Sequence, residues 1–226
     1  MLSISVPLKN AGDQAVLTKH SDRGDFFSFP ISDKPVLFTG SRYSGLDRMT
    51  CDLLIQYFAM LDYGFVVGCD AGIDRAFRLT LSHSEYADRS LVACVNRSKF
   101  RYTYGIRAQV VAPVRFSLES VIFHRSMWLA KHTSCGILFP DHPFEKKWDT
   151  GQQKLFMAYL SHLKPVFMVT EFPPDECNFY KIIPTSLNGI VRGFWIVPVL
   201  IGREHSGTEP EESYPHKLLE NPLCRE

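Results

Sequence analysis

Two short apolar runs, each ending in a glycine turn that opens a helical pattern, constrain the fold of this chain more than any other feature. The first is Val36-Leu-Phe-Thr-Gly40-Ser-Arg42, and the second is Val66-Val-Gly68-Cys-Asp-Ala-Gly72-Ile-Asp74. A parallel α/β sheet builds a phosphate site from such turns, through backbone N–H groups and helix dipoles. The pair therefore predicts a ligand that carries phosphate, either a nucleotide or a nucleic acid.

Strand-like and helical patterns alternate through the middle of the chain. Strands are expected at 36–39, 63–68, 91–95, 109–112, 135–139 and 165–169, and helices at 46–61, 73–81, 117–132 and 151–163. Residues 190–201 could add one or two edge strands. This alternation predicts an α/β fold with a Rossmann-like, mainly parallel sheet covered by helices on both faces.

Length and composition indicate one folded domain with short additions. The 226 residues are 45% hydrophobic and 22% charged, which is ordinary for a globular protein. We expect a short N-terminal β extension at 1–34, the Rossmann-like domain at 35–202 and a loose C-terminal tail at 203–226, which holds six acidic residues and three prolines. The net charge is only +1, so any affinity for polyanions requires a local patch.

The sequence predicts a cytoplasmic protein without a membrane partner, metal or cofactor. Its apolar runs are too short to span a membrane, and its N-terminus lacks the pattern of a signal peptide. The six cysteines include no C-x-x-C pair, which fits a reducing compartment, and the histidines lack the spacing of metal ligands. Neither a P-loop nor a G-x-S-x-G elbow is present.

The residues of the two glycine turns are the first candidates for ligand binding. Gly40 and Gly68 would let the backbone approach an anion, Ser41 could donate its hydroxyl, and Arg42 could hold a phosphate through paired hydrogen bonds. The second turn adds Ala71, Gly72 and Asp74. The alternatives are that the glycines only turn the chain and that Asp74 only stabilises the start of a helix.

Residues 89–118 form a basic segment with six arginines and lysines and no acidic residue. In an extended conformation, Lys99 and Arg101 would lie on one face and the neighbouring aromatic rings on the other. Basic groups beside stacking rings suit a single strand of nucleic acid, so Arg97, Lys99, Arg101 and Tyr102 are candidate nucleic-acid contacts. The alternatives are a β-hairpin with a solvated basic face and a basic mouth for a small nucleotide.

Over roughly residues 35–170 the chain resembles the SLOG superfamily, which includes the DprA/Smf DNA-processing proteins and the LOG phosphoribohydrolases. The resemblance rests on the Gly-Ser-Arg and Ala-Gly-Ile-Asp turns, on Phe123-His-Arg125-Ser-Met127 before the strand at 136–139, and on Asp149-Thr150-Gly151 before a helix, with Lys164-Pro165-Val166 opening the next strand. It implies that Arg125 contacts phosphate or base, and the alternative is a solvated arginine on a helix whose other face is apolar. Backbone groups of Thr150, Gly151 and Gln152 could close the anion site, or Asp149 or Thr150 could simply cap the helix.

The resemblance implies binding of a nucleotide or single-stranded DNA in a DprA-like manner. LOG enzymes carry a Pro-Gly-Gly-x-Gly-Thr-x-x-Glu segment that is absent here. Only Asp141, Glu145 and Asp149 could serve as catalytic carboxylates, and the alternative is that they belong to a solvated loop. The alternatives are a LOG-like hydrolase acting on nucleoside monophosphates and a sensor or accessory subunit that reads a nucleotide signal. Whether the protein is an enzyme and whether it forms a homo-oligomer remain open from the sequence.

Overall fold

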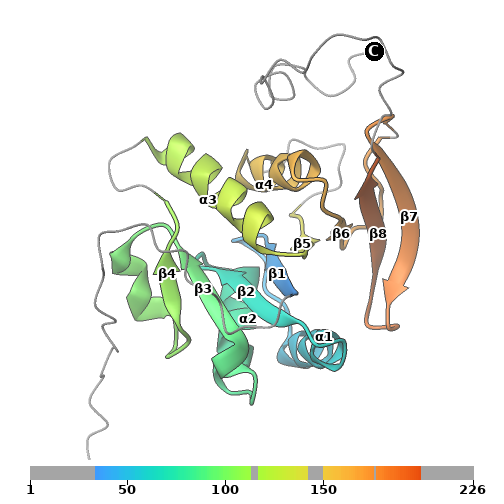
Figure 1. Ribbon diagram of the computed structural model, residues 1–226. Coiled ribbons are helices and arrows are strands. Elements are labelled where there is room, and N and C mark those ends of the chain that lie inside the picture. The colour runs from blue at the N-terminus through green and yellow to red at the C-terminus, as the bar shows by residue number, and fades with distance from the viewer. Residues whose placement is uncertain (1–33, 113–116, 142–149, 176, 200–226) are drawn as a thin grey trace, which may run out of the picture.

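An eight-stranded sheet runs through the protein in the order β4-β3-β2-β1-β5-β6-β8-β7 (Figure 1). The computed structural model describes residues 34–112, 117–141, 150–175 and 177–199. The strands are β1 (Pro35–Gly40), β2 (Gly64–Gly68), β3 (Ser90–Cys94), β4 (Ala108–Val110), β5 (Cys135–Phe139), β6 (Val166–Met168), β7 (Tyr180–Leu187) and β8 (Val191–Pro198). Neighbouring strands from β4 to β6 are parallel, whereas β8 pairs antiparallel with β6 and with β7. The predicted mainly parallel α/β fold is confirmed.

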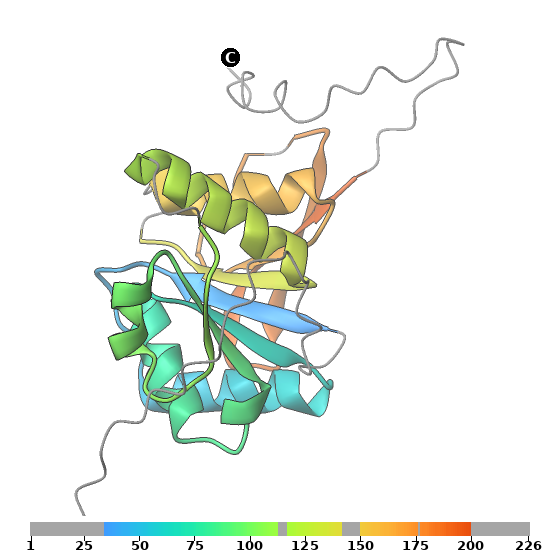
Figure 2. The ribbon, with the colours of Figure 1, turned by 60° about the vertical axis from the view of Figure 1, so that its left-hand side comes forward.

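Helices cover both faces of the sheet (Figure 2). The helical elements are α1 (Arg48–Met60), α2 (Ile73–Ser82), α3 (Leu118–His132) and α4 (Thr150–Ser161), with the 3₁₀ helices η1 (Ala87–Arg89) and η2 (Arg97–Tyr102). Helices α1 and α2 lie on one face, and α3 and α4 lie together on the other. All residues of β2, β3 and β5 are buried, which explains why these strands are continuous apolar runs in the sequence.

Side chains alternate between the two cores along each strand. In β1, Phe38 packs with α1 and α2, and its ring stacks on Phe77 at a centroid distance of 4.2 Å. Its neighbour Leu37 points the other way and joins the core beneath α3 and α4, where Tyr159 is fully buried. The period of two thus builds a separate core under each helix pair.

Polar caps define where two of the helices begin. Asp47 precedes α1, and its carboxylate accepts a hydrogen bond from the Thr50 N–H at 2.9 Å. Ser117 precedes α3, and its hydroxyl oxygen accepts from the Ser120 N–H at 3.3 Å. Both caps satisfy amides that have no partner inside their own helix.

The sheet ends in a β-hairpin that the sequence pattern revealed only in part. Strand β8 lies within the predicted 190–201 segment, whereas β7 was not predicted. Asn188 and Gly189 connect the two strands with positive φ values of 48° and 73°, as in the Asn-Gly turns typical of tight hairpins. Pro184 lies in β7, the edge strand, where a missing N–H is tolerated.

The two predicted additions, the N-terminal β extension and the C-terminal tail, lie outside the described residues apart from Lys34. Within the described ranges, every helix is too short or too polar to span a bilayer.

Candidate functional site

The carboxyl ends of β1, β2 and β5 meet at the point where the strand order reverses. From β1 the chain continues to β2 on one side, while β5 pairs with the other side of β1 and leads to β6. In open parallel sheets, loops diverge at this position and leave a crevice where ligands bind. The loops after Gly40, Gly68 and Phe139 all begin here.

Ser41 shapes the first loop. Its buried hydroxyl oxygen accepts hydrogen bonds from the Tyr43 N–H at 3.0 Å and the Ser44 N–H at 2.8 Å. The Ser41 N–H donates to the Phe139 carbonyl at 2.8 Å, which ties the loop to β5. Ser41 therefore acts on the backbone, and the loop presents Arg42, whose side chain is 43% exposed, at the surface.

The two glycine turns pack directly against each other. Gly72 has a φ of +64°, and a Cβ at this position would collide with the Ser41 carbonyl oxygen and the Arg42 backbone. The Ile73 N–H, the first amide of α2, donates to the Ser41 carbonyl at 2.9 Å. This amide at the start of α2 is therefore already occupied by the first turn.

Gly40 and Gly68 also permit close packing within the protein. A Cβ on Gly40 would collide with the carbonyl oxygen of Phe139, and one on Gly68 would collide with the carboxylate of Asp74. These contacts explain why both positions require glycine, and the explanation involves no ligand. Ala71, the remaining residue predicted in the second turn, is exposed.

Asp74 is completely enclosed beneath the second turn. The Thr39 hydroxyl donates to its Oδ1 at 2.7 Å, and the Asp70 N–H donates to its Oδ2 at 3.2 Å. Burial and the nearby charge of Asp70 raise the pKa of the Asp74 carboxyl, despite the opposing effect of Arg125 and of these contacts. Asp74 thus connects β1 to the second turn as a structural acceptor.

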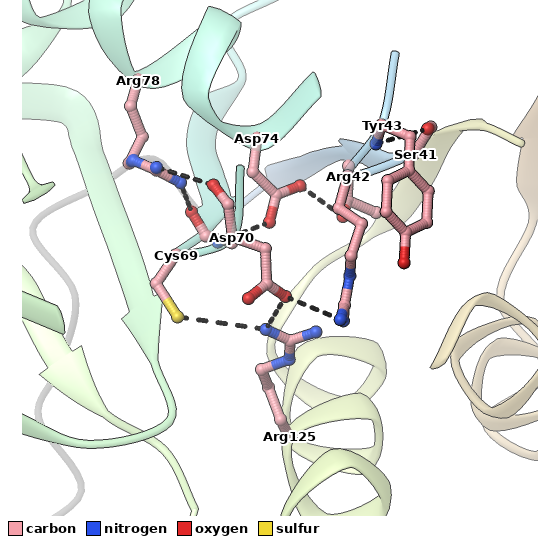
Figure 3. Close-up of polar contacts among 10 residues, drawn as sticks. Ser41, Arg42, Tyr43, Cys69, Asp70, Asp74, Arg78 and Arg125 are labelled. Carbon is pink, nitrogen blue, oxygen red and sulfur yellow. Dashed lines mark hydrogen bonds and ion pairs between the residues drawn. The ribbon is translucent and has the colours of Figure 1, made fainter. Parts of the chain in front are cut away.

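Two arginines converge on the carboxylate of Asp70 (Figure 3). The Arg125 Nη1 of α3 donates to Asp70 Oδ2 at 2.7 Å, and the Arg42 Nη2 lies 3.9 Å from the same oxygen. The Arg125 side chain is only 13% exposed and that of Asp70 24%. We call Arg42, Asp70 and Arg125 the arginine–aspartate cluster.

The cluster sets the charge of its members. Burial alone would raise the pKa of Asp70, but the charge and hydrogen bond of Arg125, together with the charges of Arg42 and Lys99, hold it below its usual range. Burial opposes the charge on Arg125, yet Asp70 and Asp74 raise the pKa of its guanidinium. Asp70 is therefore an ionised carboxylate between cations at neutral pH.

Asp70 and Arg78 were not predicted as site residues. Arg78 is 2% exposed and donates to the backbone carbonyls of Gly68, Asp70 and Tyr102 at 2.5, 2.7 and 3.0 Å. It fixes the end of β2 and links it to η2. The available signals were a carboxylate two residues after a buried strand, and an arginine four residues after Asp74 on the same helical face.

The expectation of an extended basic segment at 99–104 is wrong, because residues 97–102 form the 3₁₀ helix η2. Its turns are closed by the Lys99 N–H donating to Asn96 at 3.3 Å and the Thr103 N–H donating to Phe100 at 3.2 Å, and Phe100 packs against the core. Lys99 and Arg101 therefore do not alternate with the aromatic rings across a strand.

The predicted nucleic-acid residues still lie at the surface of η2. Arg97 and Arg101 are exposed, Tyr102 is 40% exposed, and the Arg101 guanidinium lies 4.7 Å from the Tyr102 ring centroid. Lys99 is half-buried, and its charge acts on Asp70. Lys99 thus adds positive charge to the arginine–aspartate cluster, and Arg78, which binds the carbonyls of both Asp70 and Tyr102, holds η2 beside it.

Helix α4 begins at Thr150, so Gly151 and Gln152 lie in its first turn, as predicted. Gln152 is 7% exposed, and among the residues that the structure describes its buried Nε2 has no hydrogen-bond partner. The Nε of Arg125 is likewise buried and unpartnered. Buried donors of this kind are uncommon in native proteins and require an explanation, such as a ligand or water that supplies the acceptor.

Of the three candidate catalytic carboxylates, the structure describes only Asp141. It follows β5, and its Oδ1 accepts a hydrogen bond from the Ser44 hydroxyl at 3.1 Å. Glu145 and Asp149 lie outside the described residues. In the described part of the chain, no group of three or more His, Cys, Asp or Glu side chains could hold a metal ion.

A groove of about 490 Å³ lies elsewhere, between the 45–48 loop and the outer side of α2. Gly45, Leu46, Arg48, Gly72, Arg75, Ala76, Leu79, Thr80 and His83 line it. Only Gly72 is shared with the predicted site, so the groove and the arginine–aspartate cluster are different places. The cluster has the stronger chemical case because its charges converge at the switch point of the sheet.

No protein-family model matches this chain, and no curated protein is significantly similar to it in sequence.

Proposed function

We propose that this protein binds a nucleotide, with the phosphate group held by the arginine–aspartate cluster. The observation that carries the proposal is the convergence of Arg42 and Arg125, from a loop and a helix, on one carboxylate at the switch point of the sheet. Guanidinium groups bind phosphate through parallel hydrogen bonds. Asp70 holds the two arginines close together before a ligand arrives.

The charge of the cluster favours an anion. It contains two guanidinium groups and one ionised carboxylate, and the half-buried Lys99 adds a further positive charge. The raised pKa of Asp74 limits the negative charge that this residue contributes. The net local charge is therefore positive, although the whole chain is nearly neutral.

The exposure of the two arginines suggests separate roles. Arg42 is 43% exposed and can meet a phosphate from solution, whereas Arg125 is almost enclosed. Phosphate oxygens or acceptors of the base would satisfy the unpartnered Nε of Arg125. Gln152 Nε2 is a second buried donor that a ligand at the start of α4 would satisfy.

Calorimetry with nucleoside mono-, di- and triphosphates tests the proposal. For any nucleotide that the parent protein binds, Arg42→Ala should weaken binding by ~1.5–3 kcal/mol, the scale of a charged hydrogen bond. Arg192→Ala is the matched control, since Arg192 is exposed on β8 at the far end of the sheet. Equal affinities of Arg42→Ala and the parent protein would show that the site is elsewhere.

A second candidate ligand is single-stranded DNA, favoured by the exposed Arg97, Arg101 and Tyr102 beside the cluster. An aromatic ring next to arginines offers both stacking and phosphate contacts. On this alternative, the cluster would hold one phosphate of the strand and η2 would contact its neighbours.

A LOG-like hydrolase is the alternative that Asp141 favours, because this carboxylate lies at the carboxyl edge of β5 and is held by Ser44. Such a reaction needs a carboxylate to stabilise positive charge on the sugar. We predict no enzyme-like release of base from nucleoside monophosphates, since the glutamate segment of LOG enzymes is absent. Chromatography after long incubation checks this, and base release that disappears in Asp141→Ala would favour the hydrolase.

A further inference from the structure

Cys69 and Cys94 lie side by side at the carboxyl ends of two neighbouring parallel strands. Cys94 ends β3, Cys69 directly follows β2, and the preceding residues Gly68 and Ala93 are aligned partners in the sheet. This register places Cys69 opposite Cys94 on the same face of the sheet. Both residues belong to the core beneath α1 and α2, and they are 3% and 0% exposed.

The surroundings make the two sulfur atoms chemically different. The neighbouring Cys94 side chain lowers the pKa of Cys69, with help from the positive charge of Arg125 and against the effect of burial. The Arg125 Nη1 lies 4.0 Å from the Cys69 sulfur, which points toward it (Figure 3). The neighbouring Cys69 side chain and burial raise the pKa of Cys94. These opposite shifts favour the thiolate form at Cys69 and the thiol form at Cys94.

We propose that Cys69 and Cys94 are an oxidisable dithiol, which a hydroperoxide converts to a disulfide next to Arg125. Cys69 supplies the attacking sulfur and Cys94 the second thiol. The proposal rests on the aligned positions of the two cysteines and on the contact between Cys69 and Arg125, and it holds whether or not the protein binds a nucleotide.

The reaction needs one hydroperoxide and no other reactant. The Cys69 thiolate attacks a peroxide oxygen, so that an S–O bond forms and the O–O bond breaks, and the departing hydroxide takes up a proton to become water. The Cys94 sulfur then attacks the Cys69 sulfur, losing its proton as the S–S bond forms. The S–O bond breaks, and hydroxide leaves with that proton as a second water. Two thiols are oxidised and one peroxide is reduced.

The strand geometry permits the bond. Adjacent strands lie ~4.8 Å apart, and disulfides usually join Cα atoms about 4.4–6.8 Å apart. The two side chains enter the same core from aligned positions of neighbouring strands. Closing the bond therefore needs side-chain rotation rather than movement of the sheet.

Oxidation would change the charge that Arg125 experiences. The reduced pair places a thiolate beside the guanidinium, whereas the disulfide is neutral. Asp70 then remains as the anion in hydrogen-bond contact with Arg125. The oxidised protein should therefore present a more positive cluster than the reduced one.

Peroxide titration with peptide mapping tests the proposal. In a background with Cys177→Ser and Cys224→Ser, the remaining Cys51, Cys69, Cys94 and Cys135 are all buried. Burial raises the pKa of Cys51 and of Cys135 to about 12, so these two thiols are internal controls of similar exposure. Hydrogen peroxide should produce a Cys69–Cys94 disulfide at least about tenfold faster than it oxidises either control, because only a thiolate attacks readily.

Two variants separate the steps. Cys94→Ser removes the second thiol, so Cys69 should stop as a sulfenic acid, which mass spectrometry detects as one added oxygen on the Cys69 peptide. Cys69→Ser should leave Cys94 as unreactive as the controls. A bulky aromatic disulfide reagent should react slowly with the native protein, since both sulfur atoms are enclosed. Peroxide treatment that leaves Cys69 and Cys94 reduced, or that oxidises Cys51 or Cys135 first, would overturn the proposal.

Discussion

Asp70 and Asp74 lie four residues apart, and their pKa values shift in opposite directions because their surroundings differ. Asp70 is held between Arg42 and Arg125, so its charged form is favoured. Asp74 is enclosed beneath the Gly68 turn, where burial favours its neutral form. Asp74 could be predicted at a helix start, but its burial could not, because carboxylates are rarely enclosed.

The contacts of the arginines were likewise only partly predictable from the sequence. Arg42 and Arg125 were predicted as ligand contacts, whereas the carboxylate that joins them was not. A contact between residues 70 and 125 depends on how α3 lies across the sheet, which no local pattern reports. Arg78 was missed for a related reason, since its partners are backbone carbonyls of β2, the following loop and η2.

The raised pKa of Asp74 predicts how stability depends on pH. This carboxyl ionises at lower pH in the unfolded chain than in the folded protein. Its contribution to the free energy of unfolding therefore falls as pH rises from the unfolded to the folded pKa. Asp74→Asn removes that contribution and keeps partners for Thr39 and the Asp70 N–H. Relative to the parent protein, the variant should therefore gain stability from pH 4 to pH 8.

Denaturant unfolding across this pH range measures the difference in free energy. Asp88→Asn, which changes an exposed carboxylate on η1, is the control. A difference between Asp74→Asn and the parent protein that stays constant with pH would contradict the assigned environment of Asp74.

At the scale of elements, the strands and helices whose apolar residues form the two cores could be predicted from the sequence, and the irregular segments could not. The strands from β1 to β6 follow apolar runs, whereas η2 was expected to be extended because its charged and aromatic residues alternate. Local 3₁₀ hydrogen bonds, packing of the partly buried Phe100 against the core and the bond from Arg78 to Tyr102 override that pattern. Pro184 obscured β7, although the Asn188-Gly189 turn was a usable signal.

The junction between the two glycine turns yields a test at this scale. Gly72→Ala should destabilise the protein by at least ~2 kcal/mol, because the position has a positive φ and a Cβ would meet the Ser41 carbonyl. Gly45→Ala is the matched control, since a Cβ there meets nothing within 4 Å. Thermal or denaturant unfolding compares them. Equal stability of the two variants would mean that the turns do not pack as described.

At the scale of the whole molecule, the doubly covered parallel sheet followed from alternating strands and helices, but the strand order did not. Placing β5 beside β1 creates the switch point, and this pairing joins residues about a hundred positions apart. The local patterns located the loops of the site, while the pairing of β1 with β5 brought the loops after Gly40 and Phe139 together.

The distribution of charge distinguishes a nucleic acid from a small nucleotide. If single-stranded DNA binds, neutralising Arg97, Lys99 and Arg101 together should flatten the slope of log affinity against log salt by about two units, at ~0.7 per phosphate contact. Neutralising Lys181 and Arg192, which are exposed on the β7–β8 hairpin, should leave the slope unchanged. Fluorescence anisotropy over a salt series measures both. A slope unaffected by the triple variant would remove η2 from the interface.

The central claim is that the arginine–aspartate cluster holds a phosphate group. A crystal structure of the protein with a nucleotide that calorimetry shows to bind tests it most directly. The account predicts phosphate oxygens within about 3.2 Å of guanidinium nitrogens of Arg42 or Arg125, beside the carboxyl ends of β1 and β5. A nucleotide seated instead in the groove along α2, between Leu46 and Arg75, would contradict it.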